Sequence, residues 1–203
     1  MRGFASVAGK KEREGPLGDQ FTATVQDTTF GEKSWEQAER RMQQMTLELA
    51  LEKAGLTDAD LDAAFAGDLL NQCIGSSFSL RNRGVPTLGL YGACSTMAES
   101  LLLAAMSVSG GFARTALAMT SSHFASSERQ YRFPLGYGGQ RTPTAQWTVT
   151  GAGALLLTSE GKGPYVTHVT TGRIRDAGVT DANNMGAAMA PAAYETLRAH
   201  FAD

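Results

Sequence analysis

The residues with the clearest chemical potential lie in the segment GLYGACSTMAE, residues 89–99. A single cysteine, Cys94, follows a glycine and an alanine, and an apolar helical pattern begins just after it. Thr96 and Glu99 have the spacing of a capping box, which predicts a helix N-terminus at Cys94. Amide groups and the helix dipole at such an end favour negative charge, and a cysteine there can act as a nucleophile. Two interpretations stay open: a nucleophile or anion site, and a compact side chain that fills the core.

Polar side chains also follow two other predicted strands. Asp68 and Asn71 come after a short buried strand, and His123 comes after a β-branched strand further along the chain. Because ligand sites of parallel sheets lie at the carboxyl ends of the strands, these side chains are expected to line a pocket beside Cys94. The alternative is structural, since Asp and Asn commonly cap turns and bond loop backbone.

The segment 124–147 carries aromatic residues, glycine and proline without periodicity, which predicts an ordered functional or interface loop. Its cations Arg129, Arg132 and Arg141 are natural bidentate partners for a carboxylate, although each equally suits an exposed contact in a dimer. Trp147 offers a ring for stacking on an aromatic ligand, and packing in the core is the alternative.

The elements that position these residues alternate between helix and strand. Ser34, with Gln37 as its capping-box partner, predicts a helix that Gly55 ends. The helix after Cys94 is apolar almost all round and is expected to be among the most buried. Expected strands lie at 4–7, 63–66, 85–91, 115–119, 151–157 and 165–171, and a final helix is expected from about Pro191. This order predicts an α/β layer fold with a mostly parallel sheet.

Composition narrows the function classes. The chain has 203 residues, 42% of them hydrophobic, and a formal net charge of −2, so no basic surface points to nucleic acid. It contains no apolar run long enough for a membrane span and no signal-peptide pattern, which predicts a soluble or peripheral protein. Cys73 and Cys94 do not form a disulfide framework, so a reducing compartment is expected. His168 and His200 are expected to be structural or surface residues.

Several segments together resemble known families. GAC at 92–94 is similar to the nucleophile turn of the thiolase superfamily, and GAGALLL at 151–157 resembles the glycine-rich motif of ketoacyl-ACP synthases. A narrower resemblance is to the stage V sporulation protein AD family of spore-forming bacteria. It rests on seven segments in one order: AGDLLNQ (66–72), YGACSTMAES (91–100), SGGFA (109–113), TSSHF (120–124), ERQYRFP (128–134), YGGQ (137–140) and TVTGAGA (148–154).

The resemblance implies a fold and a domain organisation. Residues 1–203 are expected to form the N-terminal half of a two-half thiolase-like fold, because the chain ends at Asp203, where the first half would end. The chain is therefore interpreted as a fragment, a split gene product or a degenerate paralogue. Thr150 stands where the synthases commonly have Asp, and the histidines that such enzymes pair with cysteine come largely from the second half. An enzyme is therefore not expected.

The function that the resemblance implies is binding of dipicolinic acid, free or as its Ca²⁺ chelate, at the spore inner membrane during sporulation. The implied partners are other stage V channel proteins and a second copy or a second-half chain, with no nucleic acid, cofactor or protein-bound metal. The expected ligand-binding residues are Cys94, Asp68, Asn71, His123, Trp147 and Arg129. Two alternatives stay open: an acyl transferase that uses Cys94, and a purely architectural half.

Overall fold

The computed structural model describes residues 1–70, 72–131, 147–181 and 184–202. The chain divides into two compact units, residues 1–164 and 165–203. The strands, all in the first unit, are β1 (Gly3–Ala8), β2 (Ala23–Thr24), β3 (Ala63–Asp68), β4 (Thr87–Leu90), β5 (Thr115–Ser122) and β6 (Gly151–Thr158). The helices are α1 (Lys10–Arg13), α2 (Trp35–Ala54), α3 (Ile74–Leu80), α4 (Thr96–Ser109), α5 (Phe124–Tyr131) and α6 (Met185–His200).

The six strands form one sheet in the order β2-β1-β6-β5-β3-β4. β6 is antiparallel to both of its neighbours, and the other pairs are parallel. All strands except β6 therefore run in one direction, which confirms the predicted α/β fold with a mostly parallel sheet. The carboxyl ends of β1, β3, β4 and β5 lie at one edge, where β6 begins. Every candidate site residue within the described chain lies at or after one of these ends, or precedes β6.

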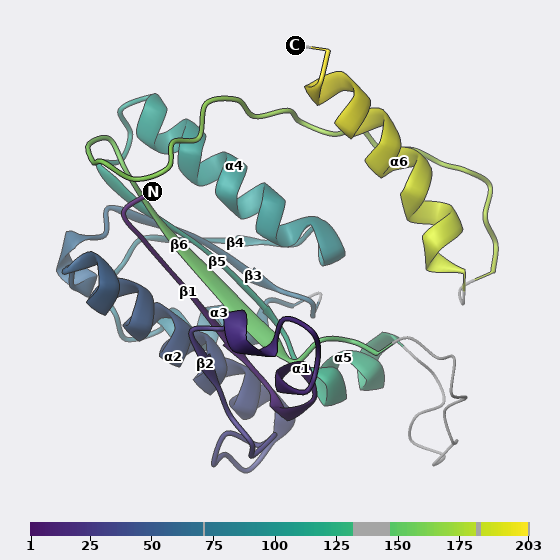
Figure 1. Cartoon of the computed structure of the whole chain (residues 1–203), viewed down its shortest axis with the longest axis horizontal. Coiled ribbons are helices and arrows are strands. Elements are labelled where there is room, and N and C mark those ends of the chain that lie inside the picture. Colours follow the sequence, from purple (N-terminus) through teal and green to yellow (C-terminus); the bar gives the residue numbers. More distant parts are fainter. Residues whose placement is uncertain (71, 132–146, 182–183, 203) are drawn as a thin grey trace. The chain divides into compact units, whose positions relative to one another are not determined.

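Helix α2 forms where the capping signals predicted it. The Ser34 hydroxyl accepts a hydrogen bond from the Gln37 amide at 3.3 Å, and Gly55 ends the helix in the left-handed conformation at φ 66°. α2 and α3 cover one face of the sheet and α4 covers the other (Figure 1). One core cluster packs α2 residues such as Leu47 and Ala50 against Leu117 of β5 and Leu156 of β6. The predicted cap and stop are confirmed.

Helix α4 is less buried than its composition predicted. Only Thr96, Ser100 and Ala104 are buried, while Leu101 to Leu103 are partly exposed and Met106 is 52% exposed. The prediction that this helix is among the most buried is therefore wrong for the described chain. Its apolar residues surround the helix, but the sheet contacts one side only, so the outer side stays uncovered within the first unit.

The second unit differs from the sequence prediction in two ways. Residues 165–171 form no strand, and α6 begins at Met185 rather than near Pro191, which lies inside the helix. Asn184 caps α6 by accepting from the Ala187 amide at 3.3 Å, so the helix already has an N-cap before the position predicted from Pro191. His200 Nδ1 lies 2.9 Å from the Thr170 hydroxyl, in keeping with a structural role.

Close packing at the end of β3 depends on one glycine. A Cβ atom on Gly67 would lie 2.4 Å from the Leu90 carbonyl oxygen and 2.5 Å from Thr96 Cγ2. Gly67 therefore lets β4 and the start of α4 approach β3, and it fixes the turn that carries Cys94. Gly89 of β4, in contrast, has open space where its Cβ would be.

We expect Gly67→Ala to lower the free energy of unfolding by about 2 kcal/mol, because the methyl group overlaps backbone atoms that cannot move independently. Gly89→Ala is the matched control and should be neutral or slightly stabilising, since alanine reduces the conformational freedom of the unfolded chain. Urea unfolding of the two variants measures the difference. Equal stability of the two variants would contradict this account of the packing.

Candidate ligand-binding site

Asp68 lies at the carboxyl end of β3 and is fully buried. Its Oδ2 accepts hydrogen bonds from the Ser76 amide and hydroxyl, both at 2.8 Å, and its Oδ1 accepts from the Leu70 amide at 3.1 Å. Burial raises the pKa of Asp68, and these hydrogen bonds oppose the rise. The side chain therefore holds the turn between β3 and α3, as the structural alternative proposed. Asn71 lies outside the described residues.

Cys94 is an exposed free thiol in a 3₁₀ turn, Ala93–Ser95, directly before α4. The turn needs Ala93 in the left-handed region at φ 49°. The predicted capping box is wrong, because the Thr96 hydroxyl bonds back to the Gly92 amide at 3.1 Å and to the Ala93 carbonyl at 2.8 Å. These bonds close the turn and leave Cys94 on the surface at the helix N-terminus.

Cys73 is a second thiol at the same edge, and it was not expected in the site. Its Sγ lies 3.2 Å from the Leu90 carbonyl oxygen, and its backbone has φ 51° at the start of α3. Burial raises the pKa of Cys73, and the charge of Asp68 adds to that rise. No sequence signal separates this cysteine from a core filler, because its position depends on how β3 and β4 pair.

His123 follows β5 and is buried. Its Nδ1 accepts a hydrogen bond from the Ala125 amide at 3.2 Å, so Nε2 carries the proton and donates to the Thr28 carbonyl at 2.8 Å. Burial lowers the pKa of His123. Both ring nitrogens are therefore engaged with backbone, and the side chain fastens the loop at Thr28 to the end of β5.

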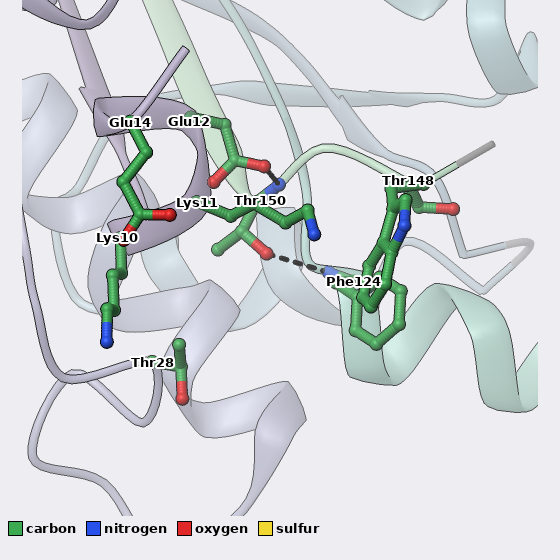
Figure 2. Close-up of a pocket in the computed structure, with 9 residues that line it drawn as sticks. Lys10, Lys11, Glu12, Glu14, Thr28, Phe124, Thr148 and Thr150 are labelled. Carbon is green, nitrogen blue, oxygen red and sulfur yellow. Dashed lines mark hydrogen bonds between the residues drawn. The ribbon is translucent and has the colours of Figure 1, made fainter. Parts of the chain in front are cut away.

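Trp147 lies just before β6 and is 46% exposed, so the core-packing alternative does not describe it. Its ring stacks on Phe124 with centroids 4.5 Å apart, and Lys11 Nζ lies 3.7 Å from the Trp147 centroid. Figure 2 shows the residues that line a cleft at the carboxyl end of the sheet, with Lys11 and Phe124 among those labelled. The cleft has a volume of about 320 Å³ and is lined by Lys10, Lys11, Glu12, Glu14, Thr28, Phe124, Trp147, Thr148 and Thr150.

Thr150 joins three walls of this cleft. Its amide donates to Glu12 Oε1 at 3.1 Å, its hydroxyl accepts from the Phe124 amide at 3.0 Å, and its carbonyl accepts from the Gly9 amide at 2.8 Å. The residue that replaces the Asp of the synthase motif therefore caps α5. The sequence did not predict Lys10, Lys11 or Phe124 as site residues. They come close because α1 follows β1, α5 follows β5, and the sheet places only β6 between these two strands.

The side-chain positions of the arginines expected to bind a carboxylate lie outside the described residues. Arg129 belongs to α5, but its side chain is outside the described residues, as are Arg132 and Arg141. Sequence reasoning also missed Glu39 and Gln43 of α2, two fully buried polar residues beneath the same edge. The apolar spacing of this helix gave no signal for them, because each only follows an apolar residue, Ala38 or Met42, on a face that docking of α2 buries.

Solved structures define the class of this fold. The 3-oxoacyl-[acyl-carrier-protein] synthase III from Aquifex aeolicus VF5 is similar with a TM-score of 0.52 and 16% identity, over 79% of this chain and 54% of that one. OleA from Xanthomonas campestris is similar with a TM-score of 0.53 and 14% identity, over 78% of this chain and 55% of that one. The chain therefore has the thiolase-like fold of these enzymes, and at such identities the likeness concerns fold alone.

The family follows from the sequence comparisons. Residues 1–203 match the family described as Stage V sporulation protein AD, and the chain belongs to that family. It is 46% identical to the Stage V sporulation protein AD of Bacillus subtilis (strain 168) over 198 residues, which cover 98% of this chain and 59% of the relative. The chain thus spans less than two thirds of that relative's length. The resemblance read from the sequence is confirmed.

We expect the His123 ring to stay neutral, with its proton on Nε2, at all pH values above the ordinary histidine pKa of 6.5. Because the folded pKa is lowered, the unfolded chain binds the proton more readily. The stability that His123 contributes is therefore present above pH 6.5 and is lost as pH falls through the folded pKa. A nitrogen-15 NMR titration of the ring reports both the tautomer and the pKa. A ring that titrates above 6.5, or carries its proton on Nδ1, would contradict this assignment.

Proposed function

We propose that the chain binds dipicolinate, pyridine-2,6-dicarboxylate, as a component of the assembly that moves this compound into spores. The observation that carries the proposal is the pairing of a partly exposed aromatic ring with an ammonium group in a cleft at the carboxyl end of the sheet. Lys11 Nζ lies 3.7 Å from the Trp147 ring centroid. Membership of the stage V sporulation protein AD family supports the same function.

The chemistry of the cleft suits a small, flat, charged ligand. A planar dianion needs an apolar wall for its ring and cations or N–H donors for its two carboxylates. Trp147 supplies the wall, and Lys10 and Lys11 supply the cations. Glu12 and Glu14 line the same cleft, so it carries both signs of charge. That pattern suits the Ca²⁺ chelate of dipicolinate, which presents a cation beside its carboxylates.

The expected ligand-binding residues have different proposed roles, some in contact with the ligand and others in holding the loops. Trp147 is proposed to touch the ligand. Cys94 follows β4, which β3 and β5 separate from β6, so it stays in the proposed set at the α4 N-terminus, outside the Trp147 cleft. Asp68 and His123 are proposed to act by position, because their polar atoms already hold the loops that form the edge. Asn71 and Arg129 stay in the proposed set as residues whose side chains the structure does not describe.

An acyl-transfer enzyme is the alternative that this proposal sets aside. A cysteine nucleophile needs a base within hydrogen-bond reach, and His123 is the histidine that follows a strand, β5, at the same edge of the sheet. Its two ring nitrogens are engaged with the backbone of Thr28 and Ala125. We therefore propose a binding role for this chain rather than a catalytic one.

The proposed location is the inner membrane of the forespore and spore, where the chain would be peripheral to other stage V channel proteins. Within the described ranges, no helix combines the length and apolar character needed to cross a membrane. A peripheral attachment through protein partners is consistent with that finding.

A partner surface is proposed along β4, the last strand of the sheet. Its outer edge has no strand partner among the described residues, and Leu88 on it is 50% exposed. Phe78 and Tyr91 nearby are 49% and 43% exposed. Exposed apolar edges of this kind are normally covered by pairing with another strand. We propose a homodimer in which two β4 edges meet, with a second-half chain as the other partner to test.

For ligand binding, we expect calorimetry to show that dipicolinate binds more tightly than the monocarboxylate picolinate, and that added salt weakens binding. Trp147→Leu and Lys11→Gln should each weaken binding about tenfold, since the first removes the aromatic wall and the second removes a cation for a carboxylate. Lys162→Gln, an exposed lysine outside the cleft, is the control. Unchanged affinity in both cleft variants would refute the site, and a stable acyl adduct on Cys94 after incubation with acyl-CoA would favour the enzyme.

For assembly, we expect light scattering to show a dimer that Leu88→Lys converts to monomer, because a charge at the paired edge opposes strand addition. Phe112→Lys is the matched control, since Phe112 is 87% exposed but lies after α4, away from the β4 edge. A wild-type chain that stays monomeric over a wide concentration range would rule out the homodimer.

A further inference from the structure

Glu39 is a carboxyl group in the centre of the first unit with an unusual set of partners. It projects from α2 and is fully buried. Its Oε1 accepts a hydrogen bond from the Ser121 hydroxyl and its Oε2 accepts one from the Ser126 hydroxyl, both at 2.8 Å. No lysine, arginine or histidine pairs with it in the part of the chain that the structure describes. A buried carboxylate without a cation is costly, so this site favours the neutral acid.

Asp68 is the second buried carboxyl, and Gly75 separates the two. A Cβ atom on Gly75 would lie 3.3 Å from both Glu39 Cγ and Asp68 Oδ2, so the glycine lets both acids reach the first turn of α3. Asp68 accepts two backbone N–H bonds and a hydroxyl bond, whereas Glu39 accepts hydroxyl bonds alone. Asp68 is therefore the better stabilised anion, and Glu39 is the group that retains a proton.

Ser126 is the hydrogen-bond partner of the Glu39 oxygen that carries this proton. Its hydroxyl lies 2.8 Å from Glu39 Oε2 and 3.1 Å from the His123 carbonyl oxygen. When Glu39 is protonated, its O–H donates to Ser126, and the Ser126 hydrogen turns to the His123 carbonyl. When Glu39 loses its proton to solvent, the Ser126 hydrogen is needed by the carboxylate, and the bond to His123 is given up. The His123 carbonyl also accepts from the Ser127 amide at 3.0 Å, so Glu39 protonation decides whether the first turn of α5 gives this carbonyl a second hydrogen bond.

Gln43, one turn further along α2, links the same carboxyl to the other strand ends. Its Nε2 donates to the Gly67 carbonyl at 3.1 Å and to the Ser121 hydroxyl at 2.7 Å. Its Oε1 accepts from the Ser79 hydroxyl of α3 at 2.7 Å. The chain of bonds thus runs from Glu39 to β5, β3, α3 and α5, which carry most of the candidate site.

We propose that Glu39 is a positioning residue that keeps its proton in the folded protein, and that loss of this proton loosens residues 123–127 at the start of α5. The consequence for ligand affinity rests on the proposed dipicolinate binding, whereas the consequence for local order does not. Among the side chains that the structure describes, the charge acting on Glu39 is that of Asp68 from β3; Cys73 lies beside Asp68 at the start of α3, and His123 follows β5. On α2 itself, Arg40 pairs with Glu32 instead.

The direction of the pH effect follows from the titration. Burial, with the charge of Asp68, raises the pKa of Glu39 from 4.5 to about 7. Between these values the folded protein holds a proton that the unfolded chain releases. The stability that Glu39 contributes is therefore complete below pH 4.5 and is lost as pH rises through about 7.

The experiment follows Glu39 by carbon-13 NMR and the amides of residues 123–127 by hydrogen exchange, from about pH 5 to about pH 8. We expect the Glu39 carboxyl to titrate well above 4.5, and exchange at these amides, corrected for intrinsic base catalysis, to rise about tenfold as it does. Glu39→Gln mimics the protonated acid and should abolish that rise. Glu52→Gln, an exposed position on the same helix, should leave it unchanged.

Two further measurements separate the role of Ser126 from that of Glu39 and test the link to ligand binding. Ser126→Ala should remove the pH dependence of exchange while Glu39 still titrates, and this variant serves if Glu39→Gln does not fold. Dipicolinate affinity should fall with rising pH in the wild type and less in Glu39→Gln. Absence of dipicolinate binding at every pH would refute the proposed function but not the positioning role. A Glu39 carboxyl that titrates near 4.5, or pH-dependent exchange identical in wild type and Glu39→Gln, would overturn the positioning role.

Discussion

The requirement to satisfy buried polar groups governs how this fold is assembled. α2 lies across the sheet with an apolar face, but Glu39 and Gln43 on that face are fully buried. Each must find hydrogen-bond partners inside the core, because an unpaired polar group there costs about 1–3 kcal/mol. Their partners come from β3, β5, α3 and α5. The helix can therefore dock in one register only, and the strand ends that form the candidate site are fixed by that docking.

The same requirement separates residues that hold the site from residues that are available to a ligand. Asp68 and His123 have the chemistry of binding or catalytic groups, yet their polar atoms are bonded to nearby backbone and hydroxyl groups. Cys94 and Trp147, in contrast, are exposed. A site whose acid and imidazole are committed to structure is suited to binding. This is the physical reason that a ligand role is proposed for a chain with the fold of acyl-transfer enzymes.

The uncovered surfaces of the first unit follow from the same architecture. The sheet buries α2 on one side, but on the other side only one face of α4 contacts it. β4 ends the sheet with apolar side chains exposed. The carboxyl-end cleft lies at a different part of the sheet, since its lining residues follow β1 and β5 or precede β6, and none adjoins β4. The proposed partner edge and the proposed ligand cleft are therefore separate, and a substitution in one can be tested without altering the other.

Local sequence signals determined the elements of this protein, and three-dimensional pairing determined its site. Ser34 and Gly55 predicted both ends of α2, because caps depend on residues close in the chain. The motif order predicted the family, and the alternation of helices and strands predicted the α/β fold. The burial of α4 and the strand at 165–171 were predicted wrongly, since composition does not say what will cover an element. The meeting of Lys11 with Trp147, the tautomer of His123 and the proton on Glu39 depend on side chains brought together from distant segments. Only the tertiary structure decided these, because hydrogen bonding and burial are properties of the assembled core.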